Sequence, residues 1–419
     1  MVAEQPTWKL FATGVREDCL RAQPPWPIFG GALERLWRVE REWFGRYRFG
    51  ETAGGRNNDG NSRGARSARQ RHAGDPGLCR ADPASERLEV ADFRSPADYS
   101  VDLDPAQLRD IAAAVRHIKA AGIGLDGLQR EHFEVPSLRP VVEEIRRQVE
   151  DGRGFVLLRR LPIEDYAKDD LGLVFWGIGT HLGRGLSQSV MGDRLGHVKD
   201  FSREDPGARA YRNKQELSPH TDSCDLVGLL CLRNAQAGGG VSRLTSAISV
   251  HNTLLAEHPD VLEALYRGYV RHRRGEEQPG ELPYTPYRIP VYSNVEDKVS
   301  ARYVRSYIEA GEAAAGRPIG SAVRAVIDTF EAVTKRPELM LEFTLQPGEA
   351  YFINNYTILH ARTAFDDGDA PEDARRHLLR LWLDTPIRPV HPCIRSRGIL
   401  PVAGRTPSFD WSSITAVRH

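Results

Sequence analysis

Residues 219–232 read Pro219-His-Thr-Asp-Ser-Cys-Asp-Leu-Val-Gly-Leu-Leu-Cys-Leu232 and join a polar triplet to a continuous apolar run. The run Leu226–Leu232 has the length and the side chains of a buried β-strand. In an extended segment, residues i and i+2 point to the same side, so the imidazole of His220 and the carboxylate of Asp222 can face one point. A rigid strand directly beyond them suits a functional site at the edge of a β-sheet core.

Two further triplets of the form His-x-Asp/Glu occur in the chain, and its composition alone produces roughly two by chance. His258-Pro-Asp260 stands where a helix is expected to begin, with Asp260 as its N-cap. His132-Phe-Glu134 lies in a polar link with no apolar strand beside it. The context therefore favours His220 and Asp222 as the pair with a chemical role.

A third histidine and two arginines follow on later predicted strands. His360 ends the apolar run Tyr351–His360, and the segment Arg375-Arg-His-Leu-Leu-Arg-Leu-Trp-Leu-Asp384 comes next. Strand alternation places Arg376, Leu378, Arg380 and Trp382 on one face and apolar side chains on most of the other. Two arginines on an interior face are costly unless an anion neutralises them.

Two histidines and one carboxylate form the facial triad of non-haem Fe(II) oxygenases, which leaves metal positions open for a chelating cosubstrate and O₂. A dicarboxylic cosubstrate also needs a cation at its far end. The planar guanidinium of Arg376 can supply a bidentate ion pair there.

The remaining pattern predicts a mixed α+β protein. Helices come first and strands dominate the last third, so a doubly wound parallel sheet is disfavoured. A β-sandwich or jelly roll with flanking helices fits better. The predicted helices are Ala106–Ala121, Leu138–Val149, Asp169–Leu182, Ser249–Leu255, Asp260–Gly268 and Ile319–Thr334, and the predicted strands are Gly154–Leu161, Leu226–Leu232, Arg243–Ser249, Ala350–Leu359 and His377–Asp384.

We expect three parts along the chain: an N-terminal extension over 1–92, one domain over 93–400 and a tail over 401–419. Ala32–Tyr47 has the pattern of an amphipathic helix. A Gly- and Arg-rich insertion at about 51–80 follows, and its segment Glu51–Asp75 contains no large apolar residue. Such a segment cannot bury enough apolar surface to offset the entropy of ordering it.

Composition narrows the class of protein. The 57 basic and 57 acidic residues balance, which argues against nucleic-acid and membrane-surface binding. No apolar run is long enough to cross a bilayer and no secretion signal is recognisable. Five scattered cysteines without a CxxC motif favour a reducing compartment, so we expect a cytoplasmic protein. A homo-oligomer remains open.

Taken together, the motifs resemble the taurine catabolism dioxygenase family of Fe(II)/2-oxoglutarate oxygenases over about Arg153–Asp384. The matching pattern is His220-Thr-Asp222, Gly239-Gly-Val-Ser242, Pro347-Gly-Glu-Ala350, Asn355-x-x-x-x-His360 and Arg375-Arg-x-x-x-Arg380. The resemblance implies a double-stranded β-helix, a cupin-like jelly roll. It also implies Fe(II), 2-oxoglutarate and O₂ as cofactors, with release of succinate and CO₂ as a substrate C–H is oxidised.

The resemblance assigns roles residue by residue. His220, Asp222 and His360 would be the catalytic iron ligands, and Arg376 would bind the distal carboxylate of 2-oxoglutarate. Ser242 stands where the family usually has threonine and would support that carboxylate. Arg380 would contact the cosubstrate or an anionic substrate. The segment after His360 is lengthened by Asp366–Asp373, so Arg376 is matched by motif and not by spacing.

The substrate is less constrained. Arg302, Tyr303 and Arg305 lie between the two metal-ligand segments, and with Gln188 they are candidate substrate residues. The arginines suggest a small carboxylate, amino acid or sulfonate, whereas the run Arg271–Arg274 is expected to be solvated. The alternatives are desaturation, cyclisation or bond cleavage at the same iron, a cupin-like enzyme without 2-oxoglutarate, and a non-catalytic jelly-roll binding protein.

Overall fold

The computed structural model describes residues 90, 93–190, 192–202, 213–395 and 399. The chain separates into two compact units, Met1–Gly77 and Leu78–His419, and the described residues belong to the second. The predicted helix Ala32–Tyr47, the insertion at about 51–80 and the tail 401–419 lie outside the described residues. No helix in the described part of the chain is long and apolar enough to span a membrane.

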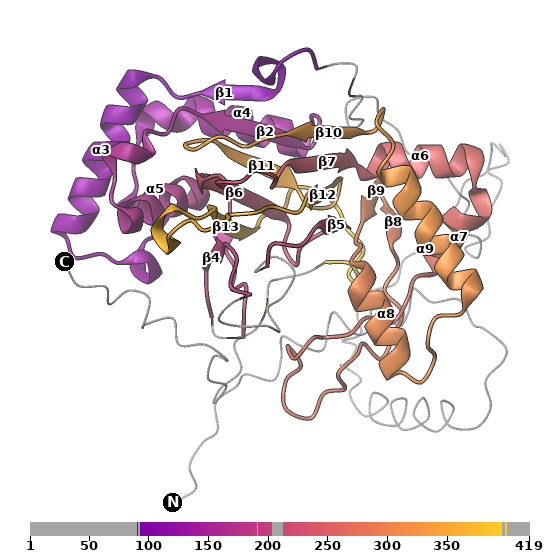
Figure 1. The fold of residues 1–419 in the computed structure, drawn as a ribbon. Coiled ribbons are helices and arrows are strands. Elements are labelled where there is room, and N and C mark those ends of the chain that lie inside the picture. The colour runs from indigo at the N-terminus through magenta and orange to yellow at the C-terminus, as the bar shows by residue number, and fades with distance from the viewer. Residues whose placement is uncertain (1–89, 91–92, 191, 203–212, 396–398, 400–419) are drawn as a thin grey trace, which may run out of the picture. The chain divides into compact units, whose positions relative to one another are not determined.

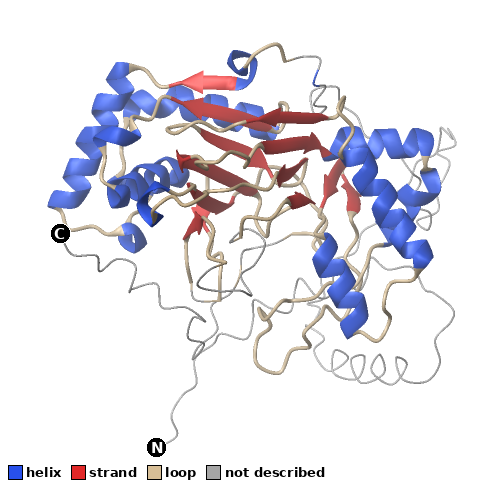
Figure 2. Cartoon of the chain, viewed as in Figure 1, coloured by secondary structure: helices blue, strands red, loops and turns tan. Residues whose placement is uncertain are grey.

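Two β-sheets form the centre of the second unit (Figures 1 and 2). The larger sheet has the order β1-β2-β11-β6-β13-β3, with β4 also paired to β13, and the smaller has the order β10-β7-β12-β5. Among the described strands of these sheets, only β1 and β2 pair in parallel. The strands are β1 (Ser100–Asp102), β2 (Phe155–Arg159), β3 (Arg184–Gly185), β4 (Leu195–Val198), β5 (Leu217–His220), β6 (Leu226–Arg233), β7 (Ser242–Ser246), β8 (Tyr292–Val295), β9 (Lys298–Ala301), β10 (Met340–Phe343), β11 (Ala350–Asn354), β12 (Ile358–Arg362) and β13 (His377–Asp384).

Side-chain alternation along β13 builds two separate cores. Leu379, Leu381 and Leu383 face outward and join a core with the first group of helices. Leu378 and Trp382 face inward, into the core between the two sheets. The predicted alternation is therefore correct, and both faces of the strand are buried. Two packed sheets that are antiparallel except at β1, with helices outside, are the predicted jelly-roll architecture.

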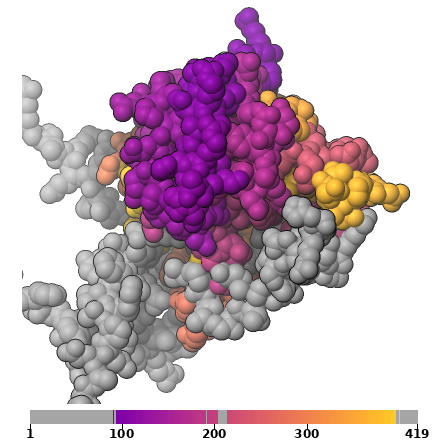
Figure 3. All heavy atoms as spheres, turned by 90° about the vertical axis from the view of Figure 1, so that its left-hand side faces the viewer, coloured from indigo at the N-terminus to yellow at the C-terminus, as the bar shows by residue number. Residues whose placement is uncertain are grey.

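The helices cover the sheets in two groups (Figure 1). The first group packs on the outer face of the larger sheet, and Figure 3 shows its indigo and magenta segments on that side of the molecule. The second packs with the β8–β9 hairpin around the buried rings of Tyr292 and Phe330. The first group is α3 (Pro105–Ala120), α4 (Arg139–Glu150) and α5 (Lys168–Thr180); the second is α6 (Ala247–Glu257), α7 (Pro259–Arg267), α8 (Arg305–Ala314) and α9 (Ser321–Thr334).

Several predicted boundaries differ from the structure, and three of these differences have a clear physical reason. The run Ala350–Leu359 is two strands, β11 and β12, which lie in different sheets and are separated by a turn, so His360 lies within β12. The predicted strand Arg243–Ser249 ends at Ser246, because the Ser246 hydroxyl caps α6 by accepting the backbone N–H of Ser249. The N-cap of α7 is His258 and not Asp260, since Pro259 already occupies the first helical position.

Candidate metal centre and anion pocket

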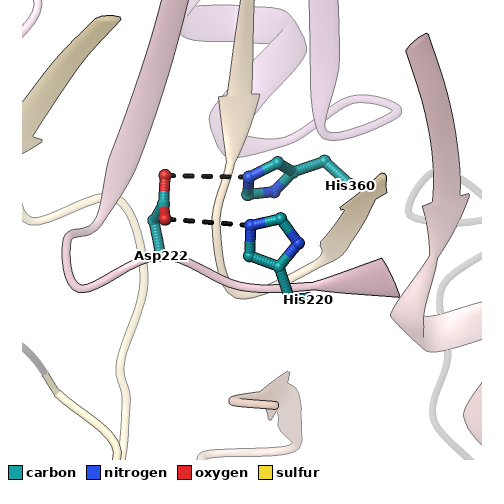
Figure 4. A group of neighbouring side chains, drawn as sticks. All are labelled: His220, Asp222 and His360. Carbon is teal, nitrogen blue, oxygen red and sulfur yellow. Dashed lines mark ion pairs between the residues drawn. The ribbon is translucent and has the colours of Figure 1, made fainter. Parts of the chain in front are cut away.

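Three side chains converge at the open edge of the smaller sheet. His220 ends β5 and pairs in register with His360 of β12, while Asp222 follows two residues after β5. One ligand atom from each lies within 4.8 Å of the others. Figure 4 shows both rings on one side of the Asp222 carboxylate, at Nε2–O distances of 3.9 Å for His220 and 3.7 Å for His360. Pairing across two strands therefore completes the triad.

The environment of His220 leaves the correct nitrogen available to a metal. Its Nδ1 lies 2.9 Å from the carbonyl oxygen of Ser218, so Nδ1 carries the proton and Nε2 presents its lone pair towards Asp222. Burial, reinforced by the neighbouring His360, lowers the pKa of His220 to about 3. The imidazole is therefore neutral at physiological pH, which is the form that binds metals.

The Asp222 carboxylate is held ionised and in place. Burial opposes its ionisation, but Arg380 and the two imidazoles outweigh that effect and hold its pKa well below the usual range. The indole Nε1–H of Trp382 donates to Oδ2 at 2.8 Å, and Nη1 of Arg380 lies 3.3 Å from the same oxygen. Two side chains on the inward face of β13, in the larger sheet, thus hold Asp222, which follows β5 of the smaller sheet.

Asn355 fixes the backbone that carries Asp222. Its Oδ1 accepts the Asp222 N–H at 2.8 Å, and its Nδ2 donates to the carbonyls of Asp222 and Cys224. The sequence motif contains Asn355, but strand periodicity alone could not show this role because the residue lies in the turn between β11 and β12. An asparagine at a turn five residues before a candidate ligand is the signal that identifies it.

Arg380 and Gln188 form one buried unit. Nε of Arg380 donates to Oε1 of Gln188 at 2.8 Å, and Nε2 of Gln188 donates to the Arg380 carbonyl. The structure thus places Gln188 behind Arg380, where it orients the guanidinium towards Asp222. Gln188 was expected near the substrate; this geometry makes it a positioning residue.

A cavity runs from the triad to a cluster of cations. Its lining includes His220, His360, Ser242, Tyr351, Arg362 and Arg376. Arg376 is 4% exposed, and its Nη1 has no hydrogen-bond partner among the described residues. Burial lowers the pKa of Arg376. Gly240 (φ 72°) leaves room for this guanidinium, because a Cβ there would lie 2.7 Å from Nε.

The predicted substrate residues separate in space. Arg302 reaches the triad side, where Nη2 donates to the hydroxyl of Ser223 at 3.0 Å. Tyr303 is fully buried and donates its hydroxyl to Glu331 at 2.7 Å. Arg305 opens α8 and pairs with acidic residues of α8 and α9, Glu309, Asp328 and Glu331. Of the three, only Arg302 has a side chain directed towards the triad segment.

Arg271, which was expected to be solvated, is buried. It is 4% exposed, its Nη2 donates to the Arg302 carbonyl, and Nε and Nη1 have no partner among the described residues. Burial, together with the charge of Arg302, lowers the pKa of Arg271. The isolated sequence could not show this, because the polar run Arg271–Arg274 has no apolar periodicity.

The donor set and the fold define a class of protein. The two imidazoles of His220 and His360 and the ionised carboxylate of Asp222 are a donor set that would fit a divalent iron. The buried cationic end of the same cavity fits the far carboxylate of a chelating dicarboxylic acid. This is the constellation of a non-haem iron oxygenase on a jelly roll.

The chain belongs to the taurine catabolism dioxygenase TauD, TfdA family, whose profile matches residues 114–382. It is 31% identical over 304 residues to FR-33289 synthase of Streptomyces rubellomurinus, an alignment that covers 71% of this chain and 88% of the relative.

Two solved structures share the fold. Asparagine oxygenase in complex with Fe(II), 2S,3S-3-hydroxyasparagine and succinate has a TM-score of 0.55 at 18% identity, covering 73% of this chain and 99% of that one. The non-haem iron oxygenase OrfP in complex with Fe and α-ketoglutaric acid has a TM-score of 0.52 at 15% identity, covering 71% and 100%. The resemblance seen in the sequence is confirmed: the chain is an Fe(II)/2-oxoglutarate-dependent dioxygenase that uses O₂.

Proposed function

We propose that this dioxygenase hydroxylates an unactivated C–H bond of a small anionic substrate and releases succinate and CO₂. His220, Asp222 and His360 would hold Fe(II). Arg376, with the Ser242 hydroxyl, binds the distal carboxylate of 2-oxoglutarate. The observation that carries the proposal is one cavity lined at one end by the two histidines of the triad and at the other by a buried arginine with an unpaired N–H.

Bound iron supplies the activation of O₂ that couples oxidation of 2-oxoglutarate to oxidation of the substrate. The chain's own residues hold and shield that centre. Trp382 and Arg380 keep Asp222 oriented, and Asn355 fixes its backbone. Apolar side chains of the inner sheet faces, including Leu229 and Leu378, line the cavity and limit water.

The anionic character of the substrate is supported by Arg302 and Arg271. Thr221 and Tyr303 are hydrogen-bonded to each other through the Thr221 N–H and the Tyr303 carbonyl at 2.8 Å, which sets Arg302 beside the segment that carries Asp222. Arg271 lies directly behind, bonded to the Arg302 carbonyl. No ion pair joins either guanidinium to an acid of the described residues. Two cations without a carboxylate partner favour a substrate that brings its own negative charge.

Two structural neighbours support a substrate that carries a carboxylate, since both were solved with amino acids. Asparagine oxygenase was solved with a hydroxylated amino acid and succinate, which are the products expected of C–H hydroxylation. One structure of OrfP contains (3S)-hydroxy-L-Arg. An amino acid, another carboxylate or a sulfonate is the substrate class that we propose for this chain.

A succinate-release screen tests the proposal. Purified enzyme with Fe(II), 2-oxoglutarate and O₂ should release succinate above the uncoupled rate with members of an anionic panel, and the product should gain the mass of one oxygen atom. Arg302→Gln should raise KM for the active compound by about 10-fold. Its matched control, Arg305→Gln, removes an arginine three residues away that is engaged with Glu309, Asp328 and Glu331.

Other outcomes of the screen are informative. A product that loses two hydrogen atoms would replace hydroxylation with desaturation or cyclisation, and a fragmented product would indicate bond cleavage. Stimulation only by neutral compounds, with Arg302→Gln unchanged, would contradict the anionic substrate and leave the oxygenase itself intact.

A further inference from the structure

A second arginine lies at the cationic end of the cavity. Arg362 is the last residue of β12, two positions after His360, and it pairs directly with Ser242 of β7. Side chains of directly paired residues in a sheet lie on the same face and in contact distance. Arg362, Ser242 and Arg376 all line the cavity. Strand register therefore brings Arg362 beside Ser242, and both line the same cavity as Arg376; Ser242 and Arg376 were predicted to bind the cosubstrate.

The Arg362 guanidinium has unused donors. The side chain is buried at 6% exposure, and Nη2 donates to the carbonyl oxygens of Asn213 and Gln215. Its Nε and Nη1, like Nη1 of Arg376, have no partner among the described residues. The two guanidiniums stand over the same ring, with Cζ atoms 4.6 Å and 4.8 Å from the Phe365 centroid. Both guanidiniums therefore pack against Phe365, and both residues line the cavity.

Asp200 attracts Arg362 and Asp367 attracts Arg376 through space, but neither carboxylate forms an ion pair with these guanidiniums. Asp200 acts on Arg362 only at a distance, and Asp367 accepts the backbone N–H of Arg376. No ion pair links either guanidinium to a carboxylate of the described residues. Two buried like charges with unpaired donors need an external anion.

We propose that Arg362 is a second cationic ligand for the distal carboxylate of 2-oxoglutarate, acting with Arg376 and Ser242, and that it makes the enzyme select dicarboxylic over monocarboxylic 2-oxo acids. This inference rests on the proposed function in one respect, the binding of the cosubstrate at Arg376. The competing explanation is structural: Arg362 would only tie β12 to the segment that precedes β5.

A binding experiment separates the two. Anaerobic Fe(II)-loaded protein is titrated with 2-oxoglutarate and, separately, with 2-oxopentanoate, which has the same chain length but a methyl group in place of the distal carboxylate. The charge-transfer absorption that either 2-oxo acid produces on chelating the iron reports its Kd. Arg362→Gln should raise the Kd of 2-oxoglutarate by about 10-fold and leave that of 2-oxopentanoate within about twofold.

Two further variants make the result decisive. Arg362→Lys keeps the charge and should recover most of the selectivity for 2-oxoglutarate; it also carries the test if Arg362→Gln does not fold. Arg376→Gln should weaken 2-oxoglutarate selectively as well. Equal weakening of both 2-oxo acids by Arg362→Gln, or no weakening of either, would overturn the role of Arg362. No weakening by Arg376→Gln would instead overturn the proposed cosubstrate site.

Discussion

The two ends of the cavity handle charge in opposite ways. At the triad end, the buried Asp222 carboxylate receives hydrogen bonds from Trp382 and Arg380, and Asn355 holds its backbone. At the other end, Arg362 and Arg376 keep unpaired N–H groups among the described residues. At the first end, hydrogen bonds within the protein already hold the proposed metal ligand Asp222 in position. The second offers unpaired donors to an anion, in keeping with the proposal that 2-oxoglutarate binds there and that succinate leaves from there after each turnover.

Breaking the triad should have the largest effect. Asp222→Ala removes the carboxylate of the proposed triad and leaves Arg380 and Trp382 without their shared acceptor, so succinate formation should fall to background. Iron content, measured after anaerobic loading and gel filtration, should fall with it. Full iron retention by this variant would mean that the metal lies elsewhere.

A substitution at the cationic end of the cavity should weaken 2-oxoglutarate binding without changing iron binding. Arg376→Gln should raise the Kd of 2-oxoglutarate by about 100-fold, because the variant removes the buried cation that we propose pairs with the distal carboxylate of 2-oxoglutarate. Iron content should match that of the wild-type protein. Loss of iron in this variant would show that the two ends are not independent.

A smaller change at the triad end sharpens the comparison. Trp382→Phe preserves the packing between the sheets but deletes the N–H that donates to Asp222 at 2.8 Å. Iron affinity should fall by about 10-fold, as is usual for the loss of a group that orients a metal ligand. The Kd of 2-oxoglutarate, measured at saturating iron, should stay unchanged.

Arg305→Gln should have the smallest effect. This side chain pairs with Glu309, Asp328 and Glu331 on α8 and α9, away from both ends of the cavity. Iron content, the Kd of 2-oxoglutarate and KM for the substrate should remain at wild-type values. A selective rise in substrate KM would return Arg305 to the substrate side, where the sequence pattern had suggested it.

Local sequence patterns predicted correctly which way side chains point along a single strand. The i, i+2 spacing brought His220 and Asp222 together, and alternation along β13 placed Arg376 and Arg380 on the inner face. Features that depend on pairing between strands could not be predicted in this way. Arg362 becomes relevant only because it lies opposite Ser242. Gln188 reaches Arg380 only because the strands on either side of it, β3 and β4, both pair with β13.

The other errors of the sequence-based prediction concern the turn between β11 and β12 and the buried side chain of Arg271. The run Ala350–Leu359 contains no Gly or Pro to mark the turn between β11 and β12, so its division into two sheets was not visible. The same turn places Asn355 against Asp222. Arg271 looked solvated because its neighbours in sequence are charged, whereas tertiary packing buries it beneath Arg302.

The central claim, that one cavity joins an iron triad to a site for 2-oxoglutarate, is tested most directly by anaerobic absorption spectroscopy. Fe(II) and 2-oxoglutarate added together to the wild-type protein should produce a weak visible charge-transfer band that neither produces alone. The band should be absent in His220→Ala, and in Arg376→Gln it should appear only at much higher 2-oxoglutarate concentration. No band in the wild-type protein, or the same band at the same concentration in both variants, would contradict the account.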